Sequence, residues 1–240
     1  MEASLHVISK EIIKPSSETL THLRKLKLTY LDQLSPPAYV SMLFFYQTDE
    51  SRGLISTNHI QISQQLKQSL SNTLTLFYPL AGRIQDRSVV DCNDAGAEFI
   101  VARVEAKLDD ALQEPIIEQV KHLTAEATAG ALPGTALVVV KVTFFDCGGI
   151  AIGVSVSHKL ADTASVMTFL NAWAASCRGD AEFPRFSLDL ANYFPAREFP
   201  DSPYLRKLTS NEKIVTKRFL FESGSRLSFY LETFHGCGQI

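Results

Sequence analysis

The stretch ALVVVKVTFFDCGGIAIGVSVSHKLADTASVMTFLNAWAASC, residues 136–177, decides the fold of this chain. It begins with a run rich in Val and Phe, residues 136–145, and a second β-prone run covers residues 150–157. The turn residues Asp-Cys-Gly-Gly at positions 146–149 separate the two runs. Two apolar runs around a Gly-rich turn predict a β-hairpin that lies within the core.

A helix is expected directly after this hairpin. Apolar residues recur at helical spacing and would share one face: Val166, Phe169, Leu170, Trp173 and Cys177. His158 therefore falls where a buried strand ends, and Asp162 falls near the start of a helix. The ends of strands are common places for sites, because the sheet fixes the backbone there and the opening admits a ligand.

The flanking sequence predicts the remaining elements of an α/β domain with a mixed sheet flanked by helices. Strands are expected at residues 5–13, 39–46, 88–92 and 98–104. The strand at residues 39–46, YVSMLFFY, is expected to be buried. Leucines and an isoleucine recur every four residues within residues 54–76 and predict a helix, with Ser56, Thr57 or Asn58 as its cap. Prolines at positions 184, 195, 200 and 203 predict an irregular connector over residues 183–203, before a strand at residues 213–222.

Composition narrows the class of protein. The chain has 240 residues, of which 45% are hydrophobic and 20% charged, and its formal net charge is −3. These values are typical of a globular protein and give no reason to expect nucleic acid or an anionic membrane as a partner. The N-terminal residues show no secretory signal, no run reaches the length of a membrane span, and the four cysteines lack metal or redox spacing. We therefore expect a cytoplasmic protein with reduced thiols and no metal.

His158 and Asp162 are the candidate site residues that the pattern itself singles out. An imidazole is the side chain that gains and loses a proton nearest neutral pH, so His158 can act as a general base. The alternative is a hydrogen-bonded core histidine. Asp162 suits the N-cap of the following helix, and the four-residue spacing to His158 is weak on its own.

Other chemistries find less support in the sequence. Residues 153–157, GVSVS, lack the second glycine of a nucleophile elbow. Cys147 fits a thiol in a hairpin turn better than a reactive one. His235 and Cys237 would form half of a metal site, and no second half is visible. No phosphate-binding glycine pattern occurs.

Several motifs together resemble the plant BAHD acyl-CoA-dependent acyltransferases. They are YPLAGR at residues 78–83, the HKLAD block at residues 158–162 after a CGG turn, and KRF at residues 217–219. Three further segments are most similar to the vinorine-synthase-like branch of that family: residues 31–34, 90–94 and 169–173. The resemblance covers residues 3–222, most of the chain.

The family resemblance implies a fold of two similar α/β domains of the chloramphenicol-acetyltransferase type, with a channel between them. Residues 1–205 correspond to the N-terminal domain, and residues 206–222 to the start of the interdomain connection with the KRF strand. Residues 223–240 form a divergent tail, and the family's DFGWG motif does not occur in this sequence. We therefore expect the C-terminal domain to be absent from this chain.

The same resemblance implies roles for the site residues. His158 matches the general base, which takes a proton from a hydroxyl or amine that then attacks the thioester of acyl-CoA without a covalent acyl-enzyme. Asp162 matches the residue that points away from the substrate and holds the geometry of the site. Asp32 and the Ser35-Pro36-Pro37 loop are candidates for the acceptor side, with a purely structural role as the alternative.

The expected function is that of an O-acyltransferase with acetyl-CoA as co-substrate, no bound cofactor, and the hydroxyl of a plant specialised metabolite such as an alkaloid as acceptor. The competing hypothesis is an inactive remnant of the family that binds a ligand or partner. A third is hydrolysis of an ester or thioester through water activated by His158. Members of the family are typically monomers, and we expect this shorter chain to self-associate and to turn over acetyl-CoA poorly.

Overall fold

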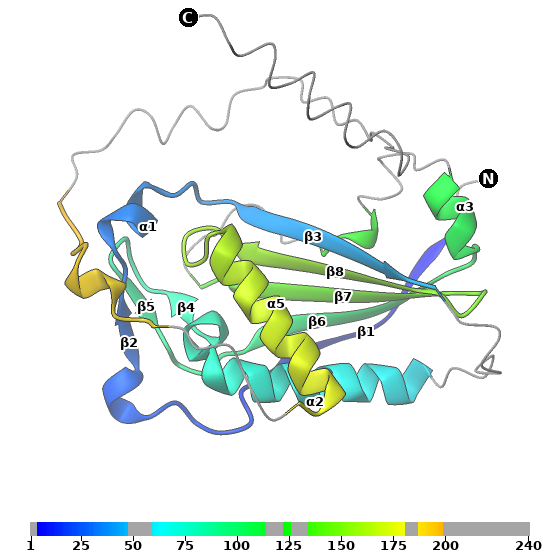
Figure 1. The fold of residues 1–240 in the computed structure, drawn as a ribbon, viewed down its shortest axis with the longest axis horizontal. Helices are drawn as coiled ribbons and strands as arrows, with labels where there is room; N and C mark the ends of the chain where they lie inside the picture. The colour runs from blue at the N-terminus through cyan, green and yellow to red at the C-terminus, as the bar shows by residue number, and fades with distance from the viewer. Residues whose placement is uncertain (1–3, 48–58, 114–121, 126–133, 181–186, 199–240) are drawn as a thin grey trace, which may run out of the picture. The chain divides into compact units, whose positions relative to one another are not determined.

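Figure 1 shows the fold of a computed structural model of the chain. The structure describes residues 4–47, 59–113, 122–125, 134–180 and 187–198. The chain groups into two units, residues 1–209 and residues 210–240, and the second lies wholly outside the described residues. The predicted strand at residues 213–222, the tail at 223–240 and the helix start at 54–58 with its three candidate caps also lie outside them.

The core is built on a mixed five-stranded sheet in the order β1-β6-β7-β8-β3 (Figure 1). These strands are β1 (Leu5–Ile13), β6 (Ala97–Val104), β7 (Val138–Phe145), β8 (Ile150–Ser157) and β3 (Tyr39–Tyr46). β6 and β7 are parallel, and the other neighbours are antiparallel. The predicted hairpin is confirmed, since β7 and β8 pair antiparallel and all eight residues of β7 are buried.

Two helices cover one face of this sheet, α2 (His59–Leu76) and α5 (Thr163–Arg178) (Figure 1). The predicted face of α5 is confirmed: Val166, Phe169 and Trp173 are buried in the main core, together with Leu70 and Leu74 of α2. The indole N–H of Trp173 donates to the Ser69 hydroxyl at 3.0 Å. The helix pair therefore interlocks through both apolar contacts and a buried hydrogen bond.

The other face of the sheet is anchored by polar contacts with residues 122–125. The Lys141 ammonium donates to the carbonyl of His122 at 2.5 Å, and the Ser155 hydroxyl donates to that of Ala125 at 2.6 Å. Gly153 lies beneath this segment, where an added Cβ would come within 2.7 Å of the Leu123 carbonyl oxygen. The glycine is therefore required for the close approach of the two backbones.

Residues 39–46 form a strand, as predicted, but the prediction that this strand is buried is wrong. β3 is at the edge of the sheet and, within the described residues, pairs only with β8. Six of its residues are half-buried, and Ser41 and Tyr46 are exposed. An apolar run does not distinguish a central strand from an edge strand, because the difference depends on pairing with distant segments.

A second, three-stranded sheet has the order β2-β5-β4, with β2 (Lys25–Lys27), β5 (Val89–Asp91) and β4 (Arg83–Ile84). The predicted strands at residues 88–92 and 98–104 both occur, but β5 and β6 lie in different sheets. Gly96, at φ +87°, lies between them, and its N–H donates to the Ala81 carbonyl at 2.8 Å. The turn therefore redirects the chain from one sheet to the other. Two short helices, α1 (Tyr30–Leu34) and α3 (Leu108–Gln113), also occur.

The YPLAGR motif forms the junction between α2 and the smaller sheet. α2 ends at Leu76, and residues Tyr78–Ala81 then form a 3₁₀ turn with Pro79 near its start. An added Cβ at Gly82 would lie 2.5 Å from the Asp91 carbonyl oxygen. The Arg83 guanidinium donates to the carbonyls of Gly82 and Gly96 at 2.7 and 2.8 Å. The motif is therefore accounted for by chain packing.

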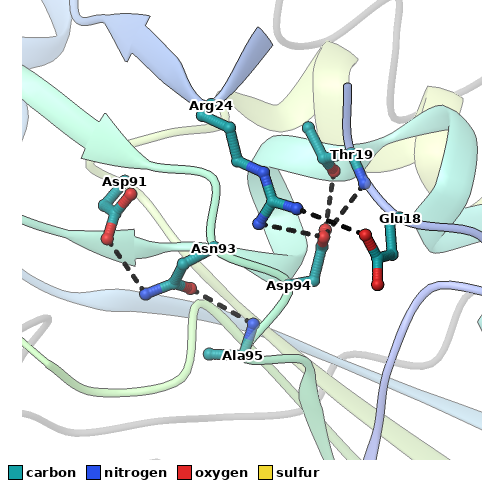
Figure 2. Close-up of polar contacts among 7 residues, drawn as sticks. All are labelled: Glu18, Thr19, Arg24, Asp91, Asn93, Asp94 and Ala95. Carbon is teal, nitrogen blue, oxygen red and sulfur yellow. Dashed lines mark hydrogen bonds and ion pairs between the residues drawn. The ribbon is translucent and has the colours of Figure 1, made fainter. Parts of the chain in front are cut away.

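Asp94 ties the N-terminal segment to this junction (Figure 2). It adopts a left-handed conformation, φ +55°, which places its carboxylate toward residues 18–24. The carboxylate accepts from the Thr19 N–H at 2.9 Å and from the Thr19 hydroxyl at 2.6 Å. The Arg24 guanidinium lies 3.3 Å from the same carboxylate. Asn93, beside it, accepts from the Ala95 N–H at 3.2 Å and so stabilises the turn.

We expect Asp94→Ala to lower the free energy of unfolding by about 2–3 kcal/mol, because it removes two charge-assisted hydrogen bonds from a largely buried carboxylate. Asp94→Asn is the matched control: asparagine also tolerates the left-handed conformation and keeps an acceptor for Thr19, so its loss should be about 1 kcal/mol. Urea denaturation followed by circular dichroism measures both. Equal effects from the two variants would contradict the assigned role of the charge.

Candidate active site

His158 is the first residue after β8, and the backbone around it is held on both sides. Its N–H donates to the Ala38 carbonyl at 2.9 Å, which attaches it to the segment that leads into β3. The N–H groups of Leu160 and Ala161 donate to the Ser157 carbonyl at 3.1 and 3.2 Å. The strand end and the turn after it therefore hold the backbone of His158 before any ligand binds.

The His158 side chain is half-buried, and its two ring nitrogens differ in their surroundings. Nδ1 is buried, and no hydrogen-bond partner for it is found in the described part of the chain. Nδ1 is therefore closed to a ligand in the neighbouring cavity, which leaves Nε2 as the nitrogen that can exchange a proton with one.

Asp162 caps α5, as predicted. Its Oδ1 accepts from the Ser165 N–H at 2.8 Å, which satisfies one of the free N–H groups at the helix start. Hydrogen bonds from Ser165 lower the pKa of the Asp162 carboxyl, and the charge of His158 lowers it further. The carboxylate is therefore committed to the helix end, four residues from the candidate base.

Lys159 links the site to α1, a contact that the sequence analysis missed. Its ammonium donates to the carbonyl of Gln33 at 2.9 Å and is 3.4 Å from that of Asp32. These carbonyls lie in the last turn of a helix, where a cation satisfies free acceptors. Burial lowers the pKa of Lys159. A lysine directly after a buried strand is a weak sequence signal for such a contact.

Asp32, the candidate for the acceptor side, has a clear structural role. One carboxylate oxygen accepts from the Thr29 N–H and from the Thr29 hydroxyl, each at 2.7 Å, and the Asp32 N–H donates to that hydroxyl oxygen at 3.0 Å. This reciprocal arrangement is a capping box that begins α1. The structural alternative for Asp32 is therefore supported, and its carboxylate holds the helix on which it stands.

One cavity of about 400 Å³ brings the sequence-predicted residues together. His158, Asp162, Asp32 and Ser35 all line it, whereas Pro36 and Pro37 do not. The other lining residues come from the same two parts of the chain and from two more, residues 77–80 and 187–191: Leu26, Lys27, Thr29, Leu31, Phe77, Pro79, Leu80, Leu160, Ala161, Ala164, Ser165, Thr168, Ser187, Leu188, Leu190 and Ala191. The lining from residues 187–191 was not predicted, because that stretch has no periodicity.

Within the described ranges, no group of three or more His, Cys, Asp or Glu side chains could hold a metal ion. No helix of these ranges is both long enough and apolar enough to cross a membrane. The proposed half-site at His235 and Cys237 lies outside the described residues.

Comparison with known proteins decides the family. The family model described as the transferase family matches residues 3–228. The chain belongs to this family. A BAHD acyltransferase of Arabidopsis thaliana is 40% identical over 230 residues, which cover 92% of this chain and 50% of that protein. The predicted resemblance to the BAHD acyltransferases is therefore confirmed.

Two relatives with named products or acceptors are similar to this chain. A vinorine synthase of Rauvolfia serpentina is 43% identical over 92% of this chain and 53% of its own length. A stemmadenine O-acetyltransferase of Catharanthus roseus is 38% identical over 92% and 53%. The chain thus spans about half the length of the curated relatives that it matches.

The solved structures agree with the predicted fold class. A vinorine synthase structure superposes with a TM-score of 0.70 at 41% identity, over 81% of this chain and 48% of that one. A TRI101 from F. sporotrichioides, solved with coenzyme A and T-2, superposes with a TM-score of 0.50 at 17% identity, over 75% of this chain and 46% of that one. The chain therefore has the α/β fold of the CoA-dependent acyltransferases.

We expect Asp162→Ala to lower the free energy of unfolding by about 1 kcal/mol, because the helix cap is lost. Asp162→Asn should leave the free energy of unfolding at neutral pH unchanged, since asparagine caps equally well. Because hydrogen bonds lower the folded-state pKa of Asp162, its charged form stabilises the protein above the ordinary carboxyl range. This contribution is lost as the pH falls through the lowered pKa. Between pH 7 and pH 2, thermal melts should show a larger loss in the parent than in Asp162→Asn, because the other carboxylates are common to both proteins. Equal losses in the two proteins would rule the mechanism out.

Proposed function

We propose that the chain carries the general-base half of an acyl-CoA-dependent O-acyltransferase, with acetyl-CoA as donor and His158 as base. The observation that supports this most is the position of His158 in the wall of a cavity with its Nδ1 buried, from which we infer that Nε2 is the ring nitrogen that meets an acceptor. A base must lie within hydrogen-bond reach of the hydroxyl that it deprotonates. A cavity of about 400 Å³ beside it has room for an alcohol.

In the proposed reaction, His158 Nε2 takes the proton of the acceptor hydroxyl as its oxygen attacks the thioester carbonyl carbon. A C–O bond forms, and the carbonyl oxygen carries the negative charge of the tetrahedral intermediate. That intermediate collapses, the C–S bond breaks, and the CoA sulfur leaves with the electron pair. The sulfur then receives the proton from the imidazolium, so His158 is restored and no acyl group is attached to the protein.

The neighbouring residues have supporting roles in this proposal. Asp162 caps the start of α5, the helix that follows the His158 turn, and so supports the position of the base. Lys159 holds α1 against the same turn, so that the acceptor side keeps its distance from His158. Such positioning contributes by holding reactants in a productive geometry.

The acceptor proposed here is an alcohol of plant specialised metabolism. The names of several relatives support it, since they include a stemmadenine O-acetyltransferase and a salutaridinol 7-O-acetyltransferase. The latter, from Papaver somniferum, is 36% identical over 92% of this chain and 51% of its own length. Acetyl transfer to a hydroxyl is the chemistry that these names have in common.

We expect His158→Ala to lower the rate of acetyl transfer by about 10²–10⁴-fold, the usual cost of losing a general base, with little change in the melting temperature. The measurement is the release of the CoA thiol when the purified protein is mixed with acetyl-CoA and each alcohol of a panel. His22→Ala, an exposed histidine that does not line the cavity, is the matched control. Near-normal turnover in His158→Ala would remove His158 from the mechanism.

A further inference from the structure

Residues 187–198 contact α1, and residues 187–191 of this segment form part of the wall of the His158 cavity. We propose that this segment, the strap, selects the body of the acceptor, and that it favours a compact apolar ring system over a small or polar alcohol. The inference rests on the proposed function for the reaction, but the recognition itself is a binding property of the cavity. The first part of the strap, residues 187–191, lines the cavity, and the second part, residues 194–197, holds the strap on α1.

The anchors lie in the second part of the strap. The Phe194 carbonyl accepts from the Tyr30 N–H at 3.1 Å, and this N–H belongs to the first turn of α1, where it has no partner within the helix. The Arg197 N–H donates to Gln33 Oε1 at 2.9 Å. The Arg197 guanidinium lies over the Tyr30 ring, 5.1 Å from its centroid. These three contacts fix the strap on the helix that carries Asp32.

The first part of the strap lines the cavity with leucines. Leu188 and Leu190 retain 36% and 49% of their surface exposed, and Leu31 of α1, also in the cavity wall, retains 47%. Large apolar side chains that are half exposed inside a cavity gain from any apolar surface that covers them. A ligand with an apolar body therefore completes the burial of these three leucines.

The polar groups of the cavity argue against a highly hydroxylated ligand. The Asp32 carboxylate already accepts two hydrogen bonds from Thr29, and the Asp162 carboxylate accepts one from Ser165. Polar groups that are engaged in this way have less capacity for a ligand. The hydroxyls of Ser35 and Thr168 donate to the carbonyls of Leu31 and Ala164, and Lys27 and His158 also line the wall. The cavity thus offers few uncommitted polar groups to a ligand with many hydroxyls.

The strap also contains its own control residue. Tyr193 is 74% exposed and does not line the cavity, although it lies between the lining leucines and the anchors. Changes at Tyr193 test whether any substitution in the strap disturbs acceptor choice. Changes at Leu190 test whether the cavity wall itself does so.

The experiment compares kcat/KM for acetylation of borneol, a compact bicyclic alcohol, with that for 1-propanol. The full-length parent is tested beside Leu190→Ala, Leu190→Trp and Tyr193→Ala, with the melting temperature of each recorded. We expect Leu190→Trp to lower the borneol-to-propanol ratio by about tenfold, since a filled pocket rejects size by this order. Leu190→Ala should also lower the ratio, because it removes apolar surface that would cover borneol, and Tyr193→Ala should match the parent. Equal ratios in all variants would overturn the proposal.

Direct binding separates this proposal from the proposed reaction. Saturation-transfer NMR of borneol with the parent and with Leu190→Trp needs no catalysis. If the parent binds borneol but transfers no acetyl group to any alcohol, the acyltransferase proposal fails while the strap proposal is supported. If borneol binds the parent and folded Leu190→Trp equally, or binds neither, the strap proposal is overturned whatever the activity. Leu190→Ala serves for this comparison if Leu190→Trp does not fold.

Discussion

The pairing of β7 with β8 is the interaction on which the rest of the structure depends. β7 is buried on both faces, and the other strands of the larger sheet extend from this pair: β6 and then β1 beside β7, and β3 beside β8. Its ladder with β8 runs from Val138 opposite Val156 to Phe144 opposite Ile150, so the register fixes where β8 ends. His158 follows that end directly. A slip of one residue would turn the core face of β8 outward and carry the candidate base away from the cavity.

Three cationic side chains in this fold donate hydrogen bonds to backbone carbonyls of other segments. Arg83 donates to carbonyls at the junction of α2 with the smaller sheet, Lys141 to the segment over the sheet, and Lys159 to the last turn of α1. Each cation joins two segments and provides a donor for a poorly solvated carbonyl. Leaving such a carbonyl without a donor would cost about 1–3 kcal/mol of stability. These contacts explain how irregular segments are held at defined distances from the sheet.

Local signals in the sequence were sufficient to predict the hairpin, the face of α5 and the cap at Asp162, because each depends on residues a few positions apart. They also singled out His158 and Asp162, the family resemblance added Asp32, and all three residues line one cavity. Long-range contacts could not be predicted in the same way. Lys159 contacts a residue 126 positions away, and the strap lies in a Pro-rich connector without periodicity. The edge position of β3 could not be predicted either, because it depends on the pairing of β3 with the distant strand β8.

The edge strand β3 also has a consequence for the order of folding. The hairpin of β7 and β8 closes through a short turn, whereas Ser41 of β3 meets Ser155 of β8 from 114 residues away. Closing so long a loop costs entropy that must be repaid by the contacts made afterwards. β3 therefore docks late, onto a sheet that already exists. Its arrival brings Ala38 to the N–H of His158, so the base acquires its final backbone geometry only when the most distant pairing in the sheet has formed.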